Sequence, residues 1–183
     1  TGQYPGFKLA IDDRFNSLDT NLWSKGDGAV GKEGDCRFQD QGVRVNNGVM
    51  ALIVRKETIA AGYSNDHGKY KREYNHSCGE LRTNDKFKYG RIEARFHTPT
   101  TPATGFISSL FTYDAEGGEW RELDVELEGG RPGSMQSNYI FGQDVGSFDY
   151  EWSGTRKWGA WEKLHNTPRS TQQWIVYAIE WTP

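Results

Sequence analysis

The sequence predicts an all-β protein, a sandwich of antiparallel strands. Apolar and polar residues alternate over short segments, which is the period of strands buried on one face. Clusters of Gly, Pro, Asn and Thr separate these segments, and no long amphipathic helical pattern interrupts them. Many short strands with regular turn signals are typical of β-sandwiches and barrels.

A hairpin is the clearest predicted element. Residues 42–46 alternate in polarity, Asn47 and Gly48 are typical of a tight turn, and Val49–Val54 is the predicted return strand. Further strands are predicted at Arg91–Phe96, Phe106–Tyr113, Trp120–Glu128, Met135–Phe141 and Trp174–Trp181.

Two segments lack the strand pattern. Thr58–Tyr74 is polar and basic, which predicts a long surface loop. Its basic residues include Lys69, Lys71 and Arg72. Phe148–Asn166 carries Trp152, Trp158 and Trp161 among charged residues, which predicts a loop packed onto the body of the protein, with a binding role as the alternative.

Composition excludes two classes of partner. The chain has 25 acidic against 22 basic residues, whereas a nucleic-acid-binding protein needs a basic face. No segment approaches the roughly 20 consecutive apolar residues that a membrane-spanning helix requires. We therefore expect no nucleic-acid partner and no insertion into a membrane.

Cys36 and Cys78 are the only cysteines. They are either two reduced thiols or one disulfide, which would close a loop of about 43 residues and contribute roughly 4 kcal/mol. The four histidines are scattered, and no Cys-x-x-Cys pair is present, so no metal site can be assigned.

The most informative segment is Trp120–Glu128. Because alternate side chains of a strand share a face, its apolar and acidic residues separate. One face carries Trp120, Glu122, Asp124, Glu126 and Glu128, and the other carries Leu123, Val125 and Leu127.

This row of carboxylates can be explained in two ways, as catalytic groups or as a surface feature. Like charges in a row push pKa values apart, and hydrolysis of a glycosidic bond needs one ionised carboxylate and one that holds a proton. A Trp on the same face offers a flat apolar surface for a sugar ring. Because Glu122 and Glu126 are about 13 Å apart along an extended strand, this use requires a curved sheet. The simpler explanation is a solvated acidic edge or a calcium site.

The segment Trp120–Leu127 resembles the signature Trp-x-Glu-[Ile/Leu]-Asp-[Ile/Val]-Glu of glycoside hydrolase family 16. Within that family it is most similar to bacterial lichenases, which are endo-1,3-1,4-β-glucanases. Other segments resemble family segments in the same order along nearly the whole chain. They are Phe15–Trp23, Gly79–Thr83, Gly105–Tyr113, Gln136–Tyr139 and Tyr177–Pro183.

This resemblance implies a β-jelly-roll of two curved antiparallel sheets with a sugar cleft on the concave face. It implies that Glu122 is the nucleophile and Glu126 the acid/base of a retaining double displacement, with Asp124 tuning the pair. The polysaccharide would be a β-1,3-1,4- or β-1,3-glucan. The resemblance further implies sugar contacts by Trp120, Glu80, Arg82 and Asn138.

The resemblance also bears on covalent and metal chemistry. It implies that Cys36 pairs with Cys78 and that the protein is exported, where a disulfide persists. It allows a structural calcium away from the cleft, whose ligands the sequence does not identify, and no organic cofactor is expected.

Departures from the lichenase pattern leave the substrate open. Residues 28–35 lack a Tyr and an Asn that lichenases carry, and Ile140 replaces a second Tyr. The basic residues of Thr58–Tyr74 would suit an anionic or algal galactan, as in the agarase and carrageenase branches. Two further alternatives are a glycan-binding module, which would not need intact carboxylates, and a transglycosylase, which passes the glycosyl-enzyme to another sugar.

We expect residues 1–183 to form one catalytic domain that is incomplete at its C-terminus. Family members continue after the Tyr177–Trp181 strand with further strands that complete both sheets. Open sheet edges would otherwise remain. The sequence therefore predicts either a fragment or a second chain that carries the missing strands.

Overall fold

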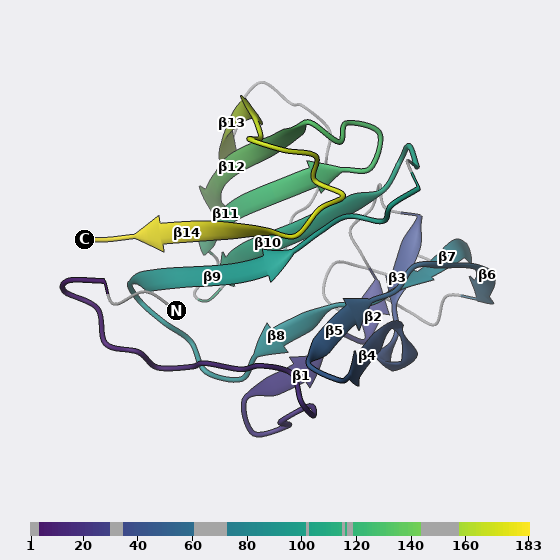
Figure 1. The fold of residues 1–183 in the computed structure, drawn as a ribbon, viewed down its shortest axis with the longest axis horizontal. Coiled ribbons are helices and arrows are strands. Elements are labelled where there is room, and N and C mark those ends of the chain that lie inside the picture. The colour runs from purple at the N-terminus through teal and green to yellow at the C-terminus, as the bar shows by residue number, and fades with distance from the viewer. Residues whose placement is uncertain are drawn as a thin grey trace. The chain divides into compact units, whose positions relative to one another are not determined.

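The computed structural model describes residues 4–29, 35–60, 73–101, 103–114, 116, 119–143 and 158–183. Their regular structure is almost entirely β (Figure 1), apart from short turns such as the 3-10 turn η1 at Asp40–Gly42. The chain divides into two compact units, Thr1–Lys88 and Tyr89–Pro183, which are described in turn. The all-β prediction is confirmed.

The N-terminal unit is built on a four-stranded sheet and two short strand pairs. The sheet order is β2 (Gly28–Ala29), β3 (Cys36–Phe38), β7 (Glu73–Cys78) and β6 (Arg55–Ala60). Strands β3 and β7 run parallel, and the other neighbours run antiparallel. The pairs are β1 (Trp23–Lys25) with β8 (Leu81–Thr83), and β4 (Val43–Asn46) with β5 (Val49–Leu52).

The predicted hairpin is present as β4 and β5. Its central residues Asn47 and Gly48 have φ values of 49° and 77°, both in the left-handed region. Two such residues match the twist of the flanking strands, and Asn and Gly tolerate this conformation best. The return strand ends at Leu52, two residues before the predicted end, and one further bond in the hairpin register joins the amide of Ile53 to the carbonyl of Gly42 (2.8 Å).

A disulfide joins Cys36 of β3 to Cys78 of β7, with Cα atoms 5.9 Å apart. The backbone packs tightly beside it, since a Cβ atom added at Gly42 would lie 2.5 Å from the carbonyl oxygen of Cys78. The amide of Gln39 also donates to that carbonyl oxygen (2.9 Å). The expected pairing of the two cysteines is therefore confirmed.

The C-terminal unit contains two sheets. The larger runs β10 (Ile107–Asp114), β11 (Glu119–Glu128), β12 (Ser134–Gln143) and β13 (Trp158–Asn166), with all neighbours antiparallel. The smaller pairs β9 (Gly90–Phe96) with β14 (Ile175–Trp181), and the two strands lie side by side in Figure 1. The five strands predicted in this unit are confirmed, with bounds close to those expected.

The core of this unit lies between its two sheets. Val125 and Leu127 of β11 are buried against Tyr177 and Ile179 of β14. Alternate residues on both strands are apolar and point into this layer, which produces a sandwich. Partly buried neighbours complete it, namely Ile92, Phe96, Leu110, Leu123, Met135, Ile175 and Trp181.

The prediction of a loop over Thr58–Tyr74 is wrong at both of its ends. Strand β6 continues to Ala60 and β7 begins at Glu73, with Ile59 opposite Tyr74. The described part of β6 is mostly exposed, so polar side chains are tolerated and conceal the strand period. Residues 61–72, which include Lys69, Lys71 and Arg72, lie outside the described residues.

The prediction of a loop over Phe148–Asn166 is wrong in its second half. Trp158–Asn166 forms β13, which pairs with β12 at the end of the larger sheet. Among the β13 residues whose side chains the structure describes, residues 162–164 are all exposed, so no alternation of buried and exposed positions marks this part of the strand. Residues 148–157, with Trp152, lie outside the described residues.

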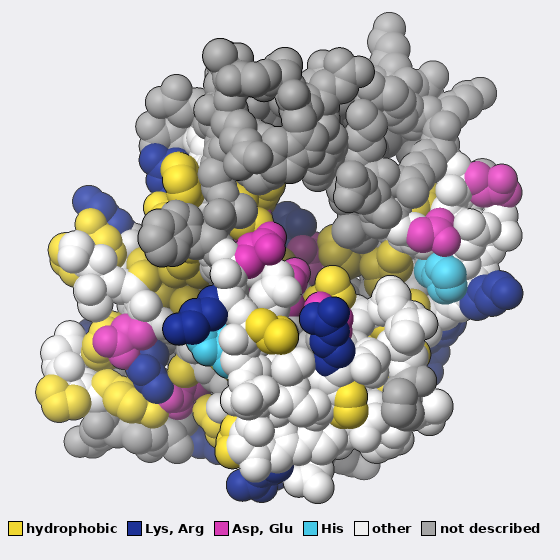
Figure 2. Space-filling view, turned by 90° about the horizontal axis from the view of Figure 1, so that it is seen from above, with side chains coloured by type: hydrophobic (Ala, Val, Ile, Leu, Met, Phe, Trp, Pro, Cys, Tyr) yellow, Lys and Arg dark blue, Asp and Glu magenta, His cyan; other side chains and the backbone are white. Residues whose placement is uncertain are grey.

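Apolar side chains also reach the surface among charged ones (Figure 2). Ile107 and Val176 are 54% and 56% exposed. In the part of the chain that the structure describes, none of the helices has the length and apolar character needed to cross a membrane.

Replacing Cys36 and Cys78 together by Ser is expected to lower the free energy of unfolding by about 4 kcal/mol, because the crosslink restricts the unfolded chain. Urea unfolding of wild type and variant measures the difference, and added reductant should affect the wild type alone. Equal unfolding free energies would contradict the prediction.

Candidate active site

Strand β11 carries the acidic row, and the core fixes which way the row faces. Val125 is 4% exposed and Leu127 is fully buried, so this face of β11 is committed to the sandwich core. The intervening residues must then point to the opposite face of the sheet. That face holds Glu122, Asp124 and Glu126, as the sequence predicts.

Strand β12 brings two amides onto the same face. In the antiparallel register Asp124 lies opposite Asn138, and Glu126 lies opposite Gln136. Directly opposed residues of neighbouring strands share a face and have their Cβ atoms about 4.5–5.5 Å apart. The sheet thus places two hydrogen-bond donors beside the carboxylates.

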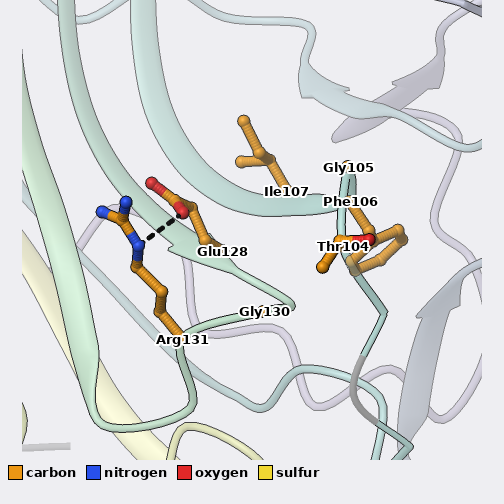
Figure 3. Close-up of a pocket in the computed structure, with 7 residues that line it drawn as sticks. All are labelled: Thr104, Gly105, Phe106, Ile107, Glu128, Gly130 and Arg131. Carbon is orange, nitrogen blue, oxygen red and sulfur yellow. Dashed lines mark ion pairs between the residues drawn. The ribbon is translucent and has the colours of Figure 1, made fainter.

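Hydrogen bonds connect the part of this row between Trp120 and Glu126. The indole N–H of Trp120 donates to Oε2 of Glu122 (2.7 Å), and Asp124 bonds to Glu122. The Asn138 amide donates to Oε2 of Glu126 (2.9 Å) and also to Asp124. The curved ribbon of this sheet in Figure 3 agrees with the curvature that the spacing of Glu122 and Glu126 requires.

Asp124 has an unusual protonation state. Burial, followed by the negative charges of Glu122 and Glu126, raises its pKa to about 8, although the bond from Asn138 acts in the opposite direction. Asp124 is only 5% exposed, so little water stabilises its ionised form. Its carboxyl group therefore keeps its proton at neutral pH.

The protonated carboxyl group of Asp124 donates a hydrogen bond to the carboxyl group of Glu122. Burial raises the pKa of Glu122, and the charge of Glu126 adds to this, whereas bonds donated by Trp120 and Asp124 lower it. Donors stabilise the ionised form of a carboxyl group. The geometry therefore favours a proton on Asp124 and a charge on Glu122, an arrangement suited to a nucleophile.

Gln136 is a further site residue, and the sequence alone predicts no role for it. Its side-chain amide donates to Oδ1 of Asn138 (2.9 Å). This bond leaves the amide nitrogen of Asn138 facing Glu126. The sequence does contain one indication of this role, because Gln136 and Asn138 are two residues apart and therefore lie on the same face of a strand.

Glu80 and Arg82 belong to the N-terminal unit and are held by each other. Glu80 is 5% exposed, and Arg82 donates to Oε1 (2.9 Å) and pairs with Oε2 (2.8 Å) of its carboxylate. Gly26 makes room for this carboxylate, since a Cβ atom there would collide with it. Their role as sugar contacts stays a prediction.

Metal ligands were not assigned from the sequence. Within the described ranges, no group of three or more His, Cys, Asp or Glu side chains has the arrangement of a metal site. The structural calcium stays a prediction.

Comparison with known sequences identifies the family of this chain. The profile of glycosyl hydrolases family 16 matches residues 30–183. A β-glucanase of Acetivibrio thermocellus is 28% identical over 172 residues, which are 92% of this chain and 43% of that protein. An endo-1,3-1,4-β-glycanase, ExoK, of Rhizobium meliloti is 28% identical over 132 residues, 70% of this chain and 44% of that protein. The chain thus spans less than half the length of these relatives.

Comparison with solved structures agrees with this family match. The β-glucanase of Bacillus licheniformis superposes with a TM-score of 0.66 and 26% identity, covering 93% of this chain and 68% of that structure. With the profile match over most of the chain and the carboxylate row on the predicted face of β11, the chain belongs to the glycosyl hydrolases family 16.

Proposed function

We propose that this protein is a retaining, endo-acting glycoside hydrolase that cleaves a β-linked glucan. The main support is the hydrogen-bonded row of carboxyl groups on β11, in which a neutral Asp124 lies between Glu122 and Glu126. A module that only binds glycans has no need of buried carboxyl groups held in different protonation states. Relatives named β-glucanase and endo-1,3-1,4-β-glycanase support a β-glucan as the substrate, with β-1,3-1,4 or β-1,3 linkages proposed from the resemblance to lichenases.

In the proposed mechanism the ionised Glu122 attacks the anomeric carbon and forms a glycosyl-enzyme ester, while Glu126, in its protonated form, gives its proton to the departing glycosidic oxygen. Water then attacks the same carbon, Glu126 removes the proton of that water, and Glu122 leaves as a carboxylate. Two inversions give net retention. Asp124 donates its hydrogen bond to Glu122 and so stabilises the charge that Glu122 carries before the attack and after the hydrolysis.

The neighbouring side chains have positioning roles in this proposal. Asn138, itself oriented by Gln136, holds the Glu126 carboxyl group from one side. Trp120 holds Glu122 through its indole N–H and can still present its ring to a sugar. Export of the protein is part of the proposal, and the disulfide supports it.

Product analysis on lichenan, laminarin, agarose and carrageenan tests the function directly. Oligosaccharides of retained anomeric configuration are expected from lichenan or laminarin. Glu122→Gln should lower kcat by at least about 10³-fold, because the nucleophile is gone, while leaving glucan binding largely intact. Products from none of the four polysaccharides, or full activity of Glu122→Gln, would overturn the proposal.

Glu126→Ala separates the two steps of the reaction. With an aryl β-glycoside whose phenol leaves without protonation, the variant should still form the glycosyl-enzyme, and its hydrolysis should slow by about 10²–10⁴-fold. Azide, which needs no general base, should then restore turnover and yield a β-glycosyl azide. Failure of azide to accelerate turnover would place the acid/base role on another residue.

Asp124→Asn tests the buried proton through stability. Between an ordinary pKa of 3.8 and the value of about 8, the unfolded chain releases this proton whereas the folded chain keeps it. The contribution of Asp124 to stability therefore falls as pH rises through this window. From pH 4 to pH 8 the variant should gain stability relative to wild type, on the order of a few kcal/mol.

Urea unfolding at several pH values measures this difference. The exposed Asp85 offers a matched control, and Asp85→Asn should follow the wild type across the range. A constant difference between Asp124→Asn and wild type would show that Asp124 is ionised throughout.

A further inference from the structure

A pocket lies beyond the acidic row, where β10 begins and β11 ends (Figure 3). Its volume is about 400 Å³. Glu128 and Ile107 are directly opposed across the two strands, and their side chains point to the same side of the sheet in Figure 3. The pocket, named here the Ile107 pocket, is lined by Thr104, Phe106, Ile107, Glu128, Gly130 and Arg131, together with Gly105.

The walls of the Ile107 pocket are held by the backbone. The amide of Gly129 donates to the carbonyl of Phe106 (2.8 Å), which ties the end of β11 to the start of β10. A Cβ atom at Gly129 would collide with the carbonyl oxygen of Ala103, so only glycine permits this approach. The amide of Arg131 closes the following turn onto the carbonyl of Glu128 (3.0 Å). The pocket is therefore formed before any ligand binds.

Its lining combines an apolar surface with a charged pair. Ile107 is 54% exposed, and Nε of Arg131 lies 3.2 Å from Oε2 of Glu128. Both charged side chains remain partly exposed, at 57% for Arg131 and 36% for Glu128. A sugar ring has the matching chemistry, because its C–H face packs on apolar carbon while its hydroxyl groups donate to a carboxylate and accept from a guanidinium.

The Ile107 pocket continues the face of the proposed active site. Glu128 follows Glu126 by two residues on the same face of β11, roughly 7 Å farther along the strand. Glu126, not Glu122, is the nearer of the two proposed catalytic carboxyl groups, and Glu126 is the group that protonates the leaving group. A ligand in this pocket would therefore contact the leaving-group half of the substrate.

We propose that the Ile107 pocket binds a sugar unit of the leaving-group half of the glucan, with Ile107 as its apolar platform and Glu128 and Arg131 as its hydroxyl partners. This inference rests on the proposed function. It adds a binding position for the part of the substrate that departs in the first step.

Methyl NMR on the Glu122→Gln protein observes this pocket without cleavage. With a mixed-linkage β-glucan hexasaccharide as the probe, the Ile107 methyl signal should shift, whereas that of buried Ile179 should not. Arg131→Ala should weaken the affinity measured from this shift about tenfold, as expected for losing one hydrogen bond to a charged group. A matched control is Arg169→Ala, which removes an exposed Arg of the same unit outside the pocket and should leave the affinity unchanged.

Kinetics on the active protein give a second readout. Arg131→Ala and Ile107→Ala should each lower kcat/KM for the hexasaccharide more than for an aryl β-glycoside, whose phenol does not reach the pocket. Val176→Ala, at a residue equally exposed on β14, should change neither value of kcat/KM.

An unchanged Ile107 methyl signal, or equal losses of kcat/KM on both substrates, would overturn the pocket assignment. If the wild type cleaves glucan while these results fail, only the pocket is excluded, whereas absence of any cleavage would exclude the proposed function itself.

Discussion

The burial of one face of β11 is the constraint on which the site depends. Val125 and Leu127 are held in the core between the two sheets of the C-terminal unit. Since side chains of a strand alternate, this burial fixes the direction of every carboxyl group in the segment. A shift of one residue in register would put the carboxylates into the core and the apolar side chains into solvent. The free energy of the core thus holds the acidic row in place.

Neighbouring carboxylates repel one another. The structure reduces this repulsion because one carboxyl group keeps its proton and the others accept hydrogen bonds. Asp124 is buried and stays neutral to about pH 8, so the row carries less charge than its composition suggests. Trp120 and Asn138 donate to the flanking Glu side chains, and Gln136 fixes the amide of Asn138. Removing any donor would leave a partly buried acceptor unsatisfied. The same network that stabilises the row therefore also sets its protonation states.

The turn that follows β11 continues the acidic face of that strand beyond Glu128. Gly129 lets the end of β11 approach Ala103, and the turn that follows positions Arg131 against Glu128. A bulkier residue at position 129 would separate these segments. The backbone thus supports a shaped surface next to the carboxylates.

The sequence alone determined the strand class, the Asn47-Gly48 hairpin and the two faces of β11, because each follows from local spacing. It did not reveal β6 or β13, whose described side chains are mostly exposed, since exposed positions that pair with a neighbouring strand need no apolar period. The role of Gln136 and the neutral state of Asp124 were decided by tertiary structure. Both depend on which residues of β12 lie opposite β11 and on burial. Neither the register between β11 and β12 nor the burial of Asp124 follows from the local spacing of residues.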